Sequence, residues 1–207
     1  YEICACLVGS EMCIRDRLRV IFATHQATVD GKGTTFNKEA HHKLARKAAE
    51  ESIVLLKNEE QILPLKQGTK VAVIGDFAKT PRYQGAGSSL VNPAMPPESI
   101  LEEIKDSGLT MTAYEQGYIR NRKPNAKMVK AAVEAAKNAD VVLFFGGLDE
   151  ISESEGLDRA HMHMPVAQDE LINELTTVNK NVIVVLSAGS SVCLLYTSPS
   201  PRDMRRS

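Results

Sequence analysis

The densest group of residues able to carry chemistry is an acidic loop, Glu150-Ile-Ser-Glu-Ser-Glu-Gly-Leu-Asp-Arg159, which holds four acids and one arginine. A carboxylate in such a loop can serve as a general acid if partial burial raises its pKa toward neutrality. Gly156 permits a sharp turn, and Asp158 with Arg159 is expected to brace the loop through charge-assisted hydrogen bonds. An ordinary solvated loop is the alternative, and composition alone favours it.

A second stretch, Gln84-Gly-Ala-Gly-Ser-Ser-Leu-Val-Asn-Pro93, combines glycines with small hydroxyl side chains. Glycines such as Gly87 allow the backbone to approach a ligand closely, and the hydroxyls of Ser88 and Ser89 suit those of a sugar. A surface turn is the alternative interpretation. The stretch alone does not indicate a ligand site, and it supports one only together with other segments.

Other kinds of site lack the spacing that they require. Gly75 follows an apolar run, but the G-x-G-x-x-G and P-loop patterns of nucleotide sites are both absent. His161 and His163 alternate as metal ligands can, but no third ligand stands at a convincing spacing. A Ser-His-Asp relay has no G-x-S-x-G signature. We therefore expect neither a metal nor a cofactor.

Short apolar runs alternate with helical periodicity in the middle of the chain. Continuous apolar runs are typical of strands covered on both faces, and Asn37 is expected to cap a long helix. The order predicts an α/β fold, a mostly parallel sheet with helices on both faces, as in a flavodoxin-like α/β sandwich. Strands are expected at 71–75, 111–114, 140–145 and 182–186, and helices at 38–56, 100–104, 128–138 and 171–178.

The direction of the strands decides where the candidate residues meet. Right-handed crossovers place the loops after Gly75, Gly146 and Ser187 at the carboxyl edge of the sheet, where open α/β folds bind their ligands. Functional groups are therefore expected at this edge. The pattern stops at the fourth strand, so we expect a truncated sheet.

The composition excludes several kinds of partner. The 207 residues carry a formal net charge of -1, with 43% hydrophobic and 25% charged residues, which excludes strong attraction to nucleic acid or to an anionic membrane. No apolar run approaches the roughly 20 residues that span a bilayer. We expect neither nucleic acid nor a membrane as partner.

The two ends of the chain differ from its middle. All four cysteines lie near the ends, and segments 1–17 and 193–207 are similar to translated sequencing adapters, so we expect both to be foreign to the fold. Between them we expect an interdomain linker with helices over 18–66 and an α/β-sandwich domain, incomplete at its C-terminus, over 67–192. The true N-terminus would then be missing, so a periplasmic, secreted or cytoplasmic localisation stays open.

Four segments taken together resemble glycoside hydrolase family 3. In chain order they are Ala48-Ala-Glu-Glu-Ser-Ile-Val-Leu-Leu-Lys-Asn58 with Leu63-Pro-Leu65; Val71-Ala-Val-Ile-Gly75 with Gly85-Ala-Gly-Ser-Ser89; Gly147-Leu-Asp149 with Glu153-Ser-Glu-Gly-Leu-Asp-Arg159; and Met164-Pro-Val-Ala-Gln168. Their order and spacing are similar to the family over about residues 18–192. The resemblance implies the second, α/β domain of a two-domain enzyme, whose preceding β/α-barrel is missing from this chain.

The resemblance also implies roles for individual residues. In the family the barrel carries a nucleophilic aspartate and the second domain lends a glutamate as acid/base. The E-G-x-D-R motif of the family matches 155–159, which makes Glu155 the acid/base candidate and Glu153 the fallback. The Gly87-Ser-Ser89 loop, Asp158 and Arg159 are expected to bind substrate or to brace the loop.

The implied activity is that of a retaining exo-glycosidase, with β-glucosidase first and β-xylosidase next. Its substrate would be a β-linked oligosaccharide or an aryl glycoside, and its two carboxyl groups would lie roughly 5–5.5 Å apart. The fragment alone is expected to be inactive. The competing class is a non-catalytic carbohydrate-binding or interdomain module.

Overall fold

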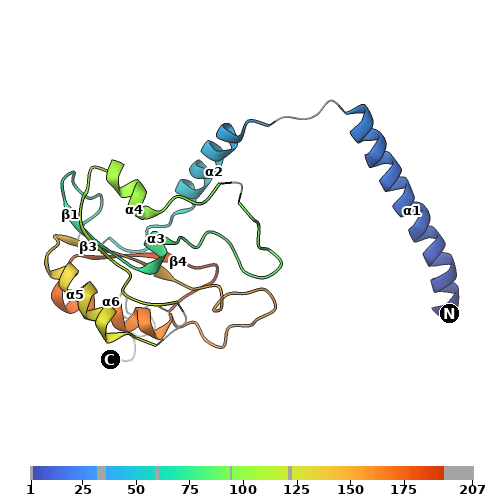
Figure 1. The fold of residues 1–207 in the computed structure, drawn as a ribbon. Helices are drawn as coiled ribbons and strands as arrows, with labels where there is room; N and C mark the ends of the chain where they lie inside the picture. Colours follow the sequence, from blue (N-terminus) through green and yellow to red (C-terminus); the bar gives the residue numbers. More distant parts are fainter. Residues whose placement is uncertain (1, 32–35, 59–60, 94, 121–122, 194–207) are drawn as a thin grey trace. The chain divides into compact units, whose positions relative to one another are not determined.

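The computed structural model describes residues 2–31, 36–58, 61–93, 95–120 and 123–193. The chain divides into two units between Leu56 and Lys57. The first contains α1 (Glu2–Asp30) and α2 (Lys38–Ser52), and the second contains all the strands (Figure 1). Within the described residues, no helix is long and apolar enough to cross a bilayer.

Helix α2 begins where the sequence predicts and ends earlier. The side chain of Asn37 accepts a hydrogen bond from the N–H of Ala40 at 3.0 Å, which confirms the predicted N-cap. The helix stops at Ser52, and Ile53 is extended with φ -75° and ψ 127°. The prediction of a helix to Leu56 was therefore wrong, because the β-branched pair Ile53 and Val54 favours extended backbone.

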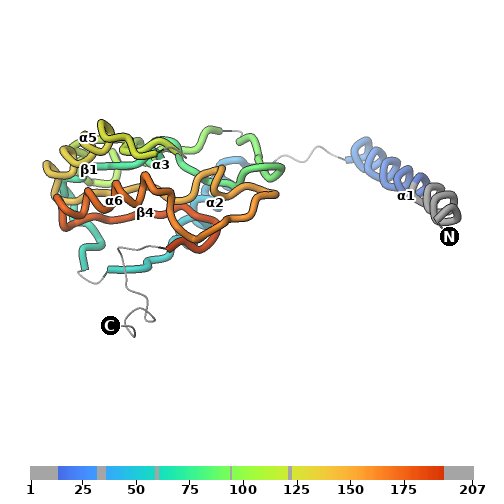
Figure 2. Tube along the Cα trace, turned by 90° about the horizontal axis from the view of Figure 1, so that it is seen from below, coloured from blue at the N-terminus to red at the C-terminus, as the bar shows by residue number. Residues whose placement is uncertain are grey.

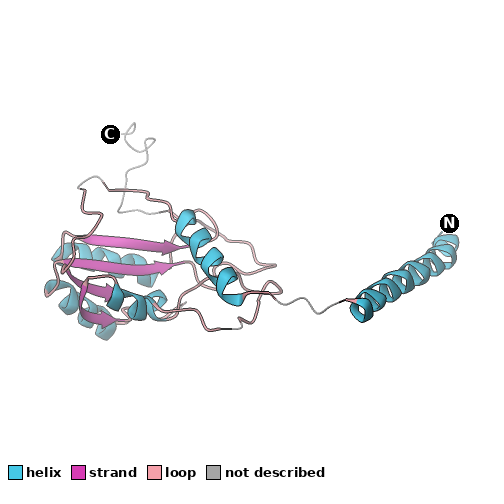
Figure 3. Ribbon diagram, turned by 90° about the horizontal axis from the view of Figure 1, so that it is seen from above, coloured by secondary structure: helices cyan, strands magenta, loops and turns pink. Residues whose placement is uncertain are grey.

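The second unit is built on four parallel strands in the order β2-β1-β3-β4. Figure 3 draws the strands of this sheet as magenta arrows. The predicted strands are confirmed with shifts of one or two residues. The bounds are β1 (Lys70–Ile74), β2 (Thr110–Glu115), β3 (Val141–Gly147) and β4 (Val182–Ser187). The central strands β1 and β3 are almost fully buried, whereas β2 and β4 form the half-exposed edges.

Helices cover both faces of this sheet, as predicted (Figures 1 and 2). Alternate residues of the central strands face opposite ways, so Ile74 and Phe144 pack on one side and Val73 and Leu143 on the other. The first side carries α5 (Ala126–Lys137) and α6 (Val166–Val178); the second carries α3 (Asp76–Lys79), α4 (Ile100–Glu103) and the 3₁₀ turn η1 (Ile104–Asp106).

The carboxyl end of β3 is fixed from two directions. Gly147 pairs with Ser187 of β4 and has φ 141°, and a Cβ atom there would lie 2.0 Å from the carbonyl oxygen of Ser187. From α6, the buried side-chain amide of Gln168 accepts from the N–H of Gly147 at 2.8 Å and donates to its carbonyl oxygen at 2.9 Å. The acidic loop therefore starts from a rigid point.

The contact at Gly147 predicts a large effect of a single methyl group. Gly147→Ala is expected to lower the free energy of unfolding by about 3 kcal/mol, because it adds a steric clash to an unfavourable φ. Gly68→Ala is the matched control: Gly68 has φ 80° but nothing within 4 Å of its Cβ position, so strain alone should cost about 1 kcal/mol. Urea denaturation measures both. Equal losses would contradict the close pairing of β3 with β4.

Candidate functional site

Three loops surround an open hollow of about 870 Å³ at the carboxyl ends of the strands. Its lining comes from segments 82–89 and 153–159, which follow β1 and β3, and from 186–190, which comprises the end of β4 and the loop after it. The chain leaves β1 toward β2 on one side and β3 toward β4 on the other. The hollow thus lies at the switch point where open parallel sheets bind ligands.

Glu155 lies against the glycine–serine loop. Its carboxylate accepts a hydrogen bond from the N–H of Ser88 at 2.7 Å and another from the Ser88 hydroxyl. The N–H of Glu155 donates to the carbonyl oxygen of Ala86 at 3.1 Å. A Cβ atom on Gly87 would stand 2.7 Å from the Cβ of Glu155, so this approach requires glycine. The two predicted segments therefore meet at the edge where they were expected.

The Glu155 carboxylate is exposed, and its hydrogen-bond partners favour the ionised form. The hydroxyl and the N–H of Ser88 lower its pKa below the ordinary value, with a smaller contribution from the N–H of Ser89. No cationic side chain pairs with it among the described residues. This environment stabilises the conjugate base, so a proton-donating form needs a change that raises the pKa.

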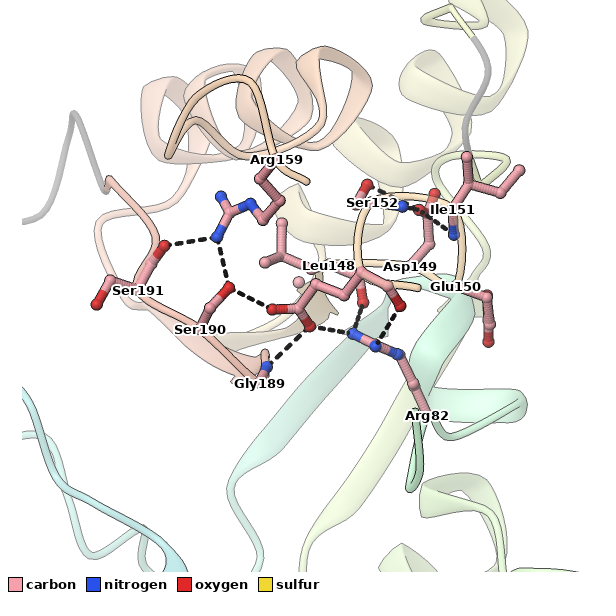
Figure 4. Close-up of polar contacts among 12 residues, drawn as sticks. Arg82, Leu148, Asp149, Glu150, Ile151, Ser152, Arg159, Gly189, Ser190 and Ser191 are labelled. Atoms are coloured by element: carbon pink, nitrogen blue, oxygen red, sulfur yellow. Dashed lines mark hydrogen bonds and ion pairs between the residues drawn. The ribbon is translucent and has the colours of Figure 1, made fainter. Parts of the chain in front are cut away.

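Glu153 has a different environment although it lies only two residues away. Its carboxylate accepts from Nη1 of Arg82 at 2.6 Å, from the N–H of Gly189 at 2.9 Å and from the hydroxyl of Ser190 (Figure 4). The side chains of Arg82 and Glu153 are 8% and 12% exposed. Burial by itself would raise the pKa of Glu153, but the donors from Ser190, Gly189 and Arg82 outweigh it and lower the pKa. The side chain of Glu153 is thus largely shielded from water, and its hydrogen-bond partners favour the ionised form.

Arg82 is absent from the residues expected from the sequence. Its Nη1 also donates to the carbonyl oxygen of Leu148 at 2.5 Å, and its Nη2 donates to that of Glu153 at 3.3 Å. A signal was available: an arginine shortly after the first predicted strand, and an excess of acids after the third. Both loops belong to one edge of the sheet, where opposite charges with little access to water are expected to pair.

Arg159 and Asp158, both expected to brace the loop or to bind substrate, have different surroundings in the structure. Nη1 of Arg159 donates to the hydroxyl of Ser190 and to the carbonyl oxygen of Ser191, both at 2.7 Å. Asp158 is exposed, and no hydrogen bond or ion pair joins it to Arg159 in the described part of the chain. Neighbouring side chains of a non-helical segment point to different sides. Arg159 therefore braces the loop against the segment after β4.

The remaining acids near the edge have other partners. Asp149 is buried and accepts from the N–H groups of Ile151 and Ser152, and Glu150 pairs with Arg120 at 2.7 Å. Among the described residues no group of three or more His, Cys, Asp or Glu is placed to hold a metal. Glu155 is the acid that the glycine–serine loop holds.

The fold is an open, mostly parallel α/β domain, and its hollow lies at the carboxyl ends of the strands. The profile of the "Glycosyl hydrolase family 3 C-terminal domain" matches residues 53–200, more than half of the chain. The chain therefore belongs to glycoside hydrolase family 3.

The proteins similar to this chain are named for different glycosidase activities. A thermostable beta-glucosidase B of Acetivibrio thermocellus is 43% identical over 178 residues, covering 84% of this chain and 23% of the relative. An exo-alpha-(1->6)-L-arabinopyranosidase of Bifidobacterium breve is 44% identical over 167 residues, which cover 76% of this chain and 22% of the relative. The crystal structure of a Bifidobacterium adolescentis GH3 beta-glucosidase superposes on this chain with a TM-score of 0.71 at 46% identity. The superposed part covers 76% of this chain and 23% of that enzyme. The chain thus spans less than a quarter of these relatives.

The engagement of Glu153 predicts a pH-dependent contribution to stability. Its pKa in the folded state is below the ordinary value of 4.5, so the ionised form stabilises the fold above that pH and the contribution is lost as the pH falls through the lower, folded value. Near pH 7, Glu153→Gln is expected to lower the free energy of unfolding by about 3 kcal/mol, because Arg82 stays buried without its counter-ion. The difference from wild type should shrink below pH 4.5.

Urea denaturation across this pH range measures the effect. Glu134→Gln is the control, since the ion pair of Glu134 with Lys137 is exposed and its removal should cost only about 0.3 kcal/mol. A loss at Glu153 that does not change with pH would contradict the assignment of an ionised carboxylate.

Proposed function

We propose that this chain is the acid/base domain of a longer, retaining exo-glycosidase, with β-glucosidase activity first and β-xylosidase activity next. One observation carries the proposal. Glu155 stands at the switch-point hollow, in contact with Ser88 and without a cationic partner among the described residues. Membership of glycoside hydrolase family 3 supports the reaction class.

The proposed reaction is a double displacement that needs a second carboxylate from the preceding barrel. That aspartate attacks the anomeric carbon while Glu155 gives its proton to the departing glycosidic oxygen. The bond from carbon to the leaving oxygen breaks as the bond to the aspartate forms. Glu155, now ionised, removes a proton from water, and the water oxygen displaces the aspartate.

The environment of Glu155 suits the second half of this cycle. The donors on Ser88 hold the carboxylate form that acts as base. For the first half, a docked barrel would remove water from Glu155 and bring an anionic aspartate near it, and both effects raise a carboxyl pKa. Once the aspartate becomes an ester its charge is gone, so the pKa of Glu155 falls again. The proton affinity then follows the need of each step.

The sugar is proposed from the similar proteins. A beta-glucosidase and an arabinopyranosidase are both more than 40% identical to this chain, so the α/β domain is compatible with different sugars. We propose a β-linked oligosaccharide or an aryl glycoside as substrate. Without the barrel, the chain is expected to act as a non-catalytic carbohydrate-binding module.

The role of Glu155 predicts how its removal affects different substrates. In the full-length enzyme, Glu155→Ala is expected to lower kcat about 10³-fold on substrates with poor leaving groups, such as disaccharides, because they need protonation. On aryl glycosides with activated leaving groups kcat/KM should fall much less, because the first step hardly needs the proton, while kcat is limited by the slow second step that has lost its base. Added azide should partly restore turnover by attacking the glycosyl-enzyme in place of activated water. Steady-state kinetics on a series of leaving groups, with and without azide, measures this.

Glu153→Ala serves as the comparison, because that carboxylate is buried in an ion pair. Added azide is not expected to restore turnover in Glu153→Ala. An equal loss on all substrates without rescue in Glu155→Ala would remove the proposed mechanism. Rescue of Glu153→Ala alone would transfer the role to Glu153.

A further inference from the structure

The ion pair of Arg82 with Glu153 joins the two arms of the candidate site. Arg82 belongs to the loop after β1, four residues before Ala86, and Glu153 belongs to the loop after β3, two residues before Glu155. The partners are 71 positions apart in the sequence, and both side chains are almost removed from water. The proposed chemistry uses neither residue directly.

The guanidinium group holds the acidic arm at two points. Its Nη1 donates to the carbonyl oxygen of Leu148, the first residue after β3 (Figure 4). Nη1 also donates to the carboxylate of Glu153, and Nη2 donates to the carbonyl oxygen of Glu153. Its Nε is buried without a hydrogen-bond partner among the described residues. Leaving a buried donor unpaired is costly. The orientation of Arg82 is therefore set by the two points that it joins.

A second brace holds the other side of Glu155. The carboxylate of Glu153 accepts from Gly189 and Ser190 of the loop after β4, and the Ser190 hydroxyl in turn accepts from Arg159. The segment is thus fastened at 153 and again at 159. Glu155 lies between these points, where its backbone N–H bonds to Ala86 and its side chain meets Ser88.

We infer that Arg82 and Glu153 are positioning residues, whose ion pair fixes the loop of Glu155 against the glycine–serine loop in the geometry that proton transfer requires. The inference rests on the proposed function. Proton transfer to a leaving oxygen depends on placement to within a fraction of an ångström, and a displacement of about 1 Å can cost 10²-fold in rate. Breaking the pair therefore affects the step that needs the proton more than it affects substrate binding.

The test uses the full-length enzyme with Arg82→Met, Arg82→Lys and Glu153→Gln, assayed on the same leaving-group series. Arg82→Met is expected to lower kcat/KM about 100-fold on poor leaving groups and only a few-fold on activated ones, with KM on poor leaving groups within about twofold. Arg82→Lys should recover only part of the loss, because an ammonium group cannot reproduce the fork of Nη1 and Nη2. Arg82→Met combined with Glu153→Gln should be no worse than Arg82→Met alone.

Arg120→Met is the matched control. Arg120 pairs with Asp76 and Glu150 at the same end of the sheet and is 21% exposed, but it has no hydrogen bond or ion pair with residues 153–159 of the described chain. Replacing Arg120 should lower the turnover of all substrates by the same factor, set by the fraction of the enzyme that is folded. Azide should rescue neither Arg82→Met nor Arg120→Met, because the Glu155 carboxylate still occupies the place that azide needs.

Two results overturn the inference. One is a loss in Arg82→Met that is uniform across leaving groups, as in Arg120→Met. The other is failure of all three variants of the pair to fold, which would make the pair a requirement of the fold rather than of the site. If either result appears while azide rescues Glu155→Ala in the same series, the inference is contradicted and the proposed function is not. If azide does not rescue Glu155→Ala, the proposed function itself is contradicted, and the inference that rests on it is contradicted too.

Discussion

The register of the parallel strands is the constraint on which the site depends. Ile74 of β1 lies beside Phe144 of β3, and Gly147 at the end of β3 lies beside Ser187 at the end of β4. These pairings bring the ends of β3 and β4 to one level, and β1 ends three positions earlier, beside Phe144. The loops that follow the three strands therefore leave from the same edge of the sheet and share one hollow. A shift of one residue would exchange the two faces of a strand, so that each side chain would meet the wrong layer of helices, and it would also move the loops apart. The site is therefore a consequence of how the core packs.

Two carboxylates on one loop show how the same chemical group receives different roles. Glu153 and Glu155 both have lowered pKa values, yet one is buried in an ion pair and the other is exposed to solvent. Removing water from a charge is favourable only when its partners compensate fully, which explains the three donors around Glu153. Glu155 has only donors from the glycine–serine loop, so its proton affinity can still respond to what approaches it.

Much of the fold was predictable because buried strands and amphipathic helices have distinct periods. The strands, both layers of helices and the shared edge of the loops that carry Ser88 and Glu155 followed from that pattern. The choice of Glu155 among the acids came from the resemblance to glycoside hydrolase family 3. The helix end at Ser52 was missed because helical spacing continued past the point where β-branched residues favour extended backbone. Arg82 was missed because its partner is distant in the sequence, and no local spacing reveals such a pair.

The pKa of Glu155 depends on whether another surface covers the hollow beside it. Tyr83 and Leu157 line this hollow and are 53% and 62% exposed, although both are large apolar side chains. Exposed apolar side chains around a polar centre favour contact with another surface. On the proposed function, a surface that covers Tyr83 and Leu157 also removes water from Glu155 and raises its pKa. Assembly of the two domains and formation of the acid are then one event, and the ion pair beneath the loop keeps Glu155 in place while it happens.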